Sequence, residues 1–252
     1  ALISEYIQGK SLETLMQENP EKIDEYMELF INTQLEVLSK QAPLLNKLKD
    51  KMKRKIEETD LSDAIKFELN MRLESTPKHN RVCHGDFNPS NVIVTDDGKV
   101  YVIDWAHVTQ GNSSADVART YLLFNLNGKK EEAEKYLNRF SEKSGIEKKY
   151  IQKWIPIVAA AHLSKASEEE KNESNEQFAQ QRKLGINMLK RCLSSSEITT
   201  SEVVQTQEEI AERKQMQALS IKSRAKHLST EEQQIFDMLR AKYERTQQEQ
   251  SN

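Results

Sequence analysis

The chain has 252 residues, enough for one large domain or two small ones with a sizeable buried core. Its 37 Lys and Arg residues nearly balance 40 Asp and Glu residues, and the net charge of −3 gives no general reason to expect nucleic acid or an anionic membrane as a partner. Seven Gly and five Pro residues are few for this length, which favours long helices and argues against an all-β sandwich.

The cysteine content and the apolar runs indicate a cytoplasmic protein. Cys83 and Cys192 are too few for a disulfide framework or a four-ligand zinc site. No apolar run approaches the roughly 20 residues that a membrane span needs, and neither end carries the apolar core of a signal peptide. The chain begins at Ala1, inside a strand-like run, and its oligomeric state is left open.

In chain order, the first predicted element is a short strand over residues 1–7, which ends before Gly9. Apolar residues at helical spacing then predict helices over about residues 20–41 and 61–73, with a basic stretch at 47–55 between them. Beyond residue 113 the pattern is again helical, and helices are expected over 114–127, 130–144, 147–166 and roughly 175–192.

Around residues 81–105, short β-branched runs replace the helical spacing. The runs VCHG, NVIVT and KVYVID predict three strands, and Asp97-Gly98 between the last two is a hairpin turn signal. The sequence changes once more after residue 193, because residues 194–252 lack Gly and Pro and carry only a thin apolar seam. We therefore expect a first domain over residues 1–193 and a helical extension over 194–252.

The polar residues that are candidates for catalysis and metal binding lie among these strands. The sequence HGDFNPSNVIV begins at His84, and it places Asp86 five residues before Asn91 on a tight loop that enters a strand. Asp104, in the sequence IDW, ends the next strand, and the hairpin turn brings the two strands side by side. Asn91 and Asp104 are therefore expected to converge, and two such oxygen ligands suit Mg²⁺. Asp86 can then orient a hydroxyl group and accept its proton, as in phosphoryl transfer by kinases.

This pattern resembles the aminoglycoside phosphotransferase family, small-molecule kinases of the protein-kinase-like superfamily. The matching text is H-G-D-x-x-x-x-N with I-D-W downstream. Gly85 stands where protein kinases usually have Arg, and Trp105 where they usually have Phe, which favours the small-molecule kinases. The resemblance implies that Asp86 is the catalytic base and that Asn91 and Asp104 hold Mg²⁺.

The resemblance also implies a fold and an ATP site. The fold would be α+β and mostly helical, a protein-kinase-like carboxy-terminal lobe with a short β-hairpin at the active site, in which His84 and Asp116 brace the loop. The sequence LISEYIQGKSL resembles the interlobe hinge of the family. The backbone groups of Ser4 and Tyr6 would then contact the polar edge of the adenine of ATP. Ile93 and Ile103 would form the apolar floor under the adenine ring.

One feature of the family is not found. Its amino-terminal lobe supplies a glycine-containing phosphate loop and a lysine that contacts the ATP phosphates, whereas here three residues precede Ser4 and no G-x-G-x-x-G occurs. We therefore expect a carboxy-terminal lobe whose amino-terminal lobe is largely absent, and an enzyme that is incomplete in this chain.

Two functions compete. The first is an ATP- and Mg²⁺-dependent phosphotransferase that acts on a hydroxyl group of a small molecule, whose identity the sequence does not choose. The second is a catalytically silent, kinase-derived helical binding module. The presence of Asp86, Asn91 and Asp104 favours the enzyme, since a silent module needs none of them.

Two charged runs have both a functional and a plain interpretation. The basic run at 47–55 is able to bind phosphate groups of a substrate, but such a run is more often a solvated helix face. The acidic run at 168–176 is able to attract a cationic substrate, but the interspersed lysines favour a solvated linker.

Overall fold

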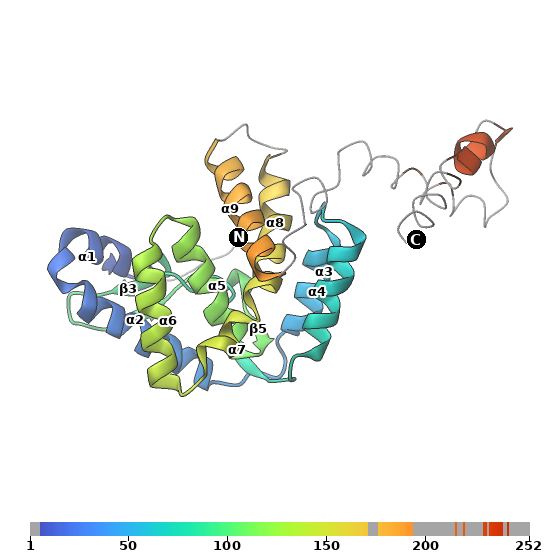
Figure 1. Cartoon of the computed structure of the whole chain (residues 1–252). Helices are drawn as coiled ribbons and strands as arrows, with labels where there is room; N and C mark the ends of the chain where they lie inside the picture. Colours follow the sequence, from blue (N-terminus) through green and yellow to red (C-terminus); the bar gives the residue numbers. More distant parts are fainter. Residues whose placement is uncertain are drawn as a thin grey trace. The chain divides into compact units, whose positions relative to one another are not determined.

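The computed structural model describes residues 6–170, 176–193, 215, 219, 229–230, 232–238 and 241 (Figure 1). The chain divides into two compact units, and the first of them, which holds the elements described below, covers residues 1–59 and 63–198. The apolar seam predicted beyond residue 193 falls almost entirely outside the described residues, so the predicted domain boundary stays a prediction. Within the described part, no helix has the length and hydropathy that a membrane crossing requires.

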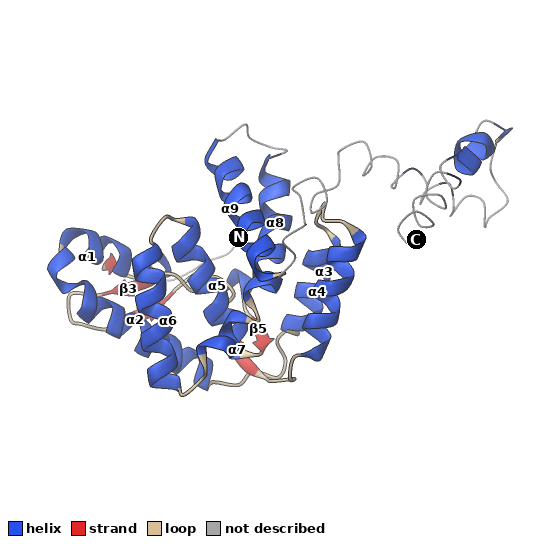
Figure 2. Ribbon diagram, in the orientation of Figure 1, coloured by secondary structure: helices blue, strands red, loops and turns tan. Residues whose placement is uncertain are grey.

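Helices make up most of this unit, as the sequence predicts, and two small antiparallel sheets supply the strands (Figure 2). The α-helices are α1 (Leu12–Glu18), α2 (Ile23–Ser39), α3 (Leu48–Glu57), α4 (Asp63–Ser75), α5 (Ser113–Leu126), α6 (Lys130–Ser144), α7 (Lys148–Gln152), α8 (Ile155–Glu170) and α9 (Glu176–Cys192). Short 3₁₀ helices are η1 (Pro20–Lys22), η2 (Pro89–Asn91) and η3 (Trp105–His107).

The single helix predicted over residues 147–166 is wrong, because the segment forms α7 and α8 with a turn between them. Pro156 lies in the first turn of α8, where its missing N–H is harmless. In a continuous helix its ring would instead clash with the carbonyl group of Gln152, four residues earlier. The proline therefore ends one helix and begins the next.

The larger sheet has the strand order β1-β3-β4, from β1 (Lys10–Ser11), β3 (Val92–Val94) and β4 (Val100–Val102). The hairpin of β3 and β4 is as predicted, with Gly98 in its turn at φ 79°. Most of the strand predicted over residues 1–7 lies outside the described residues, which begin at Tyr6; residues 6 and 7 are not in a strand, and the first described strand begins at Lys10.

The smaller sheet pairs β2 (Arg81–Cys83) with β5 (Thr109–Gly111). The first of these strands is predicted, whereas β5 is not, because its sequence TQG lacks the β-branched run that marks the others. The smaller sheet holds both ends of the segment that contains the hairpin, residues 84–108. It thereby fixes that segment onto the helices.

An aromatic cluster forms the core below the hairpin. Phe87, in the loop before β3, is fully buried, and its ring centroid lies 4.7 Å from that of Phe30 on α2. Phe124 on α5 and Tyr136 on α6 lie 6.0 and 5.9 Å from Phe30. Phe30 therefore joins the loop to an aromatic cluster from three helices.

The two cysteines are expected to differ in reactivity. Cys83 is fully buried on β2, and burial raises the pKa of its thiol well above the usual value, so the nucleophilic thiolate is scarce. Cys192 is partly exposed. Iodoacetamide at about pH 8 should alkylate Cys192 in the folded protein and Cys83 only after unfolding, as counted by mass spectrometry. Rapid alkylation of a Cys192→Ser variant would contradict this expectation.

Candidate active site

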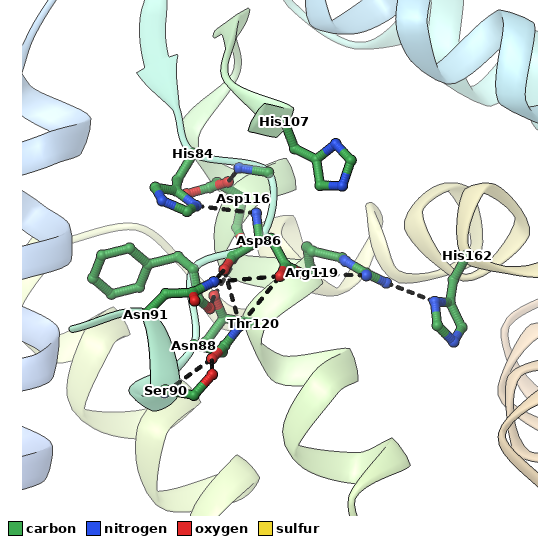
Figure 3. Close-up of polar contacts among 12 residues, drawn as sticks. His84, Asp86, Asn88, Ser90, Asn91, His107, Asp116, Arg119, Thr120 and His162 are labelled. Atoms are coloured by element: carbon green, nitrogen blue, oxygen red, sulfur yellow. Dashed lines mark hydrogen bonds and ion pairs between the residues drawn. The ribbon is translucent and has the colours of Figure 1, made fainter. Parts of the chain in front are cut away.

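Residues 84–91 form the loop between β2 and β3, and Gly85 lies near its start. Figure 3 labels the loop residues His84, Asp86 and Asn91. Gly85 has φ 83°, and a Cβ atom on it would lie 2.6 Å from the carbonyl oxygen of His107. This backbone oxygen also accepts a hydrogen bond from Lys51, and it has less room to move than the end of a side chain. No larger residue fits at Gly85, which is the physical reason for glycine between His84 and Asp86.

A Gly85→Ala variant should lose about 2–4 kcal/mol of unfolding free energy, because a positive φ and a backbone clash act together. Gly98→Ala is the matched control, since Gly98 has φ 79° but a Cβ atom on it would meet nothing within 4 Å. The control should lose only about 1 kcal/mol, the cost of the φ value. If urea unfolding gave the same loss of unfolding free energy for both variants, the carbonyl oxygen of His107 would not restrict the residue at position 85.

His84 ties the loop to the hairpin. Its side chain is fully buried, and Nε2 lies 2.9 Å from the carbonyl oxygen of Ile103, at the end of β4. Nδ1 accepts a hydrogen bond of 3.3 Å from the backbone N–H of Asp86. A neutral imidazole with its hydrogen on Nε2 satisfies both bonds. His84 is therefore engaged on both nitrogens and positions Asp86.

Side chains of helix α5 form hydrogen bonds with the backbone of the loop. The buried Asp116 accepts a 2.6 Å hydrogen bond from the backbone N–H of Gly85, and burial raises the pKa of its carboxyl group while that N–H opposes the rise. One turn later, the Thr120 hydroxyl donates to the carbonyl oxygen of Phe87 at 2.7 Å. Gln34 on α2 donates to Thr120 and accepts from the Tyr136 hydroxyl on α6. A buried network of hydrogen bonds thus fixes the loop backbone to three helices.

The carboxylate of Asp86 is held from two sides. Figure 3 shows Asn88 and Asn91 on one side of it and Arg119 on the other. Asn88 and Asn91 donate to one oxygen at 3.3 and 3.4 Å, and Arg119 lies 3.4 Å from the other. The Asp86 side chain is still 24% exposed, so it is oriented and accessible at once.

Asn91 and Asp104 lie at the same end of the hairpin. The backbone N–H of Ile103 donates to the carbonyl oxygen of Asn91 at 3.0 Å, which extends the β3–β4 ladder by one step. Asp104 comes next, with φ 60° and ψ 63°, a left-handed conformation that Asp tolerates better than most residues. Its side chain is exposed, and the structure gives its carboxylate no partner among the described residues.

The residues predicted to contact a nucleotide are only partly brought together. Ile93 and Ile103 share a face of the hairpin, because Ile93 pairs with Tyr101 and Ile103 lies two residues further on. Both are half-buried. The side chain of Tyr6 is 86% exposed, and Ser4 lies outside the described residues.

A cleft of about 760 Å³ opens beside Gly85. Its walls come mainly from α3, from residues 106–109 and from α8, and Arg119 reaches it from α5. Besides contacting Asp86, Arg119 lies 3.0 Å from Nδ1 of His162 on α8. Burial lowers the pKa of its guanidinium group, and the charge of Asp86 opposes that shift. The sequence predictions missed Arg119, although its position three residues after Asp116 puts both on one face of α5.

The sequence profile of the phosphotransferase enzyme family matches residues 2–154, so the chain belongs to this family. The aminoglycoside phosphotransferase resemblance is thereby confirmed. A comparison with curated protein sequences gives no match.

Two solved structures show the fold. Choline kinase LicA from Streptococcus pneumoniae is similar at 18% identity and a TM-score of 0.52, over 76% of this chain and 73% of that one. A thermostable mutant of aminoglycoside phosphotransferase APH(4)-Ia, in a ternary complex with AMP-PNP and hygromycin B, is similar at 18% identity and a TM-score of 0.51, over 77% and 72%. The predicted protein-kinase-like, mainly helical fold is confirmed.

Proposed function

We propose that this phosphotransferase is ATP- and Mg²⁺-dependent and transfers the γ-phosphoryl group of ATP to a hydroxyl group of a small molecule. One observation carries the proposal: the loop of residues 84–91 holds the Asp86 carboxylate beside Asn91, and the hairpin ladder brings Asp104 to the same end. A base, an amide oxygen and a second carboxylate are the parts that phosphoryl transfer requires.

In this proposal Asp86 is the catalytic base. The acceptor hydroxyl donates a hydrogen bond to Asp86, and its oxygen forms a bond to the γ-phosphorus as the bond from that phosphorus to the bridging β–γ oxygen breaks. The proton passes to Asp86, and ADP leaves. Asn88, Asn91 and Arg119 fix the carboxylate during this step, and the neutral His84 holds the backbone of Asp86 rather than exchanging the proton.

Asn91 and Asp104 would hold Mg²⁺, and their chemistry fits this ion. The amide nitrogen of Asn91 is directed to Asp86, so its carbonyl oxygen faces elsewhere, and Asp104 adds an exposed carboxylate. Oxygen donors of this kind suit Mg²⁺. Within the described residues no three His, Cys, Asp or Glu side chains cluster, so phosphate and water oxygens would complete the shell. Mg²⁺ would neutralise charge that develops on the phosphates.

The nucleotide would lie against the hairpin. Ile93 and Ile103 supply a half-buried apolar face for the adenine ring, and the backbone near Ser4 and Tyr6 would contact its polar edge. The chain at Gly9 runs against this face, since a Cβ atom there would be 2.9 Å from Cγ2 of Ile93. The structural relative that holds AMP-PNP supports a nucleotide in this fold.

The direct experiment measures ADP release and transfer of labelled γ-phosphate by the intact protein, with Mg·ATP and a panel of hydroxylated small molecules. Transfer that depends on both Mg²⁺ and an acceptor is expected. Mg·ATP binding should be measured in parallel by calorimetry. An intact, folded protein that neither binds Mg·ATP nor transfers phosphate would favour the silent binding module instead.

A further inference from the structure

The cleft beside Gly85 lies apart from the residues proposed to hold the nucleotide. Gly85, Arg119 and His107 line it, together with side chains of α3 and α8. The lining does not include Asp86 itself, nor the proposed nucleotide and metal residues Asn91, Ile93, Ile103 and Asp104. Arg119 bridges the two regions through its contact with Asp86 (Figure 3). The cleft is therefore placed to receive the acceptor molecule.

Positive charge dominates the lining of this cleft. Five of its lining residues are Lys or Arg and a single one is acidic: Lys47, Lys51, Arg54, Lys55 and Arg119 against Asp50. Glu58, just beyond, lies 3.4 Å from Lys55 and 3.6 Å from Arg54. Asp86 pairs with Arg119, and the negative charge of Asp116 acts on Lys51, so four carboxylates lie near these five cations. The described structure thus leaves a surplus of positive charge in a concave site.

The packing of α3 explains why these cations face the cleft. Leu48, Met52 and Ile56 recur every four residues and form its buried stripe. Lys51 and Lys55 each precede a buried residue by one position, so they lie along one edge of that stripe and are half-buried. The basic run is therefore more than a solvated face, which was the interpretation that the sequence favoured.

Each of the two half-buried lysines has a neutral partner, and Lys55 also pairs with Glu58. Lys51 donates to the carbonyl oxygen of His107 at 2.9 Å, and Lys55 donates to the Ser164 hydroxyl at 3.2 Å. Burial lowers the pKa of Lys51, and the positive charges of Arg119, Lys55 and Arg54 lower it further. Mutual repulsion of this kind is relieved when an anion enters the cleft.

We propose that the cleft binds an oxyanionic group of the acceptor, a phosphate or a carboxylate, through Lys51, Lys55 and Arg54. A hydroxyl group of the same molecule then reaches Asp86. This inference rests on the proposed function and adds its substrate class: a hydroxylated small molecule that carries negative charge. The same cations disfavour a polycationic acceptor, because like charges repel in a partly desolvated site.

The test measures the binding of inorganic phosphate to the full chain by isothermal titration calorimetry. Lys51→Gln with Lys55→Gln should weaken binding about tenfold or more, since two charge-assisted hydrogen bonds are lost. The matched control is Lys40→Gln with Lys53→Gln, which removes the same charge from exposed lysines outside the cleft. The control should bind phosphate as the unmodified chain does. Equal weakening in both double variants would overturn the proposal.

Further measurements distinguish a role of these cations in acceptor binding from a role in nucleotide binding. Phosphate binding should persist when the protein is saturated with Mg·AMP-PNP, and its abolition would mean that the cations hold the nucleotide, which overturns the proposal. Acetate should bind more weakly than phosphate, because it carries less charge.

If the double variant fails to fold, Lys55→Gln alone should still weaken phosphate binding, and an unchanged affinity overturns the proposal. If the unmodified protein binds inorganic phosphate in the cleft but transfers no phosphoryl group to any acceptor, the proposed function is refuted and the anion site is not.

Discussion

Replacement of Asp86 by Asn in the intact protein is expected to lower kcat by about 10²–10⁴, the usual contribution of a general base. Asn has the same shape as Asp and still accepts the hydrogen bonds of Asn88 and Asn91, but it does not take up the hydroxyl proton. Mg·ATP affinity should change little, because Asp86 is proposed to act on the acceptor. Turnover numbers and calorimetric nucleotide binding, measured on the same preparation, check both parts.

The matched control for this variant is Asp96→Asn, which makes the same chemical change at the exposed hairpin turn. It should leave kcat unchanged. Arg119 loses its ionic partner when Asp86 is replaced, so thermal melting must show that the variant remains folded. A folded Asp86→Asn protein with nearly full kcat would contradict the assignment of the base.

Replacement of Asp104 should act on nucleotide binding rather than on proton transfer. Asp104→Asn removes the charge of a proposed Mg²⁺ ligand, and it should weaken Mg·ATP binding by about ten- to hundredfold, the range of a lost charge-assisted contact. The half-saturating Mg²⁺ concentration should rise in parallel. Asn is preferable to Ala here, because Asp104 has φ 60° and Asn tolerates that conformation.

Nucleotide binding without Mg²⁺ serves as the internal control for this variant. ATP affinity in the presence of a chelator should be the same for the variant and the unmodified protein, because the proposed role of Asp104 passes through the metal. Unchanged Mg²⁺ dependence in a folded Asp104→Asn protein would show that this carboxylate is not a ligand.

The sequence was sufficient for the hairpin and its loop because their determinants are local. Asp86 and Asn91 are five residues apart, and the Asp97-Gly98 turn sets the β3–β4 register that pairs Ile103 with Asn91 and leaves Asp104 at the same end of the hairpin. Glycine at position 85 is likewise a local signal, although its reason, the carbonyl oxygen of His107, appears only in the folded chain.

The remaining features depend on contacts between distant segments. Arg119 meets both Asp86 and His162 across 33 and 43 residues of chain, and no local pattern encodes such a meeting. The strand β5 forms because β2 offers it a partner, against its own weak propensity. The orientation of the basic run was partly accessible, since the four-residue repeat of Leu48 and its successors fixes the buried face of α3.

Apart from α5, the helices that support the loop and the helices that wall the cleft are different ones. Gln34, Thr120 and Tyr136 anchor the loop from α2, α5 and α6, whereas the cations of the cleft come chiefly from α3. Substitutions along α3 therefore leave the anchoring bonds in place. With the acceptor in this cleft, as proposed, changes on α3 would alter acceptor preference without touching the anchors of the proposed reacting groups. Arg119 lies on α5, which belongs to both groups of helices, so such changes should be most constrained there.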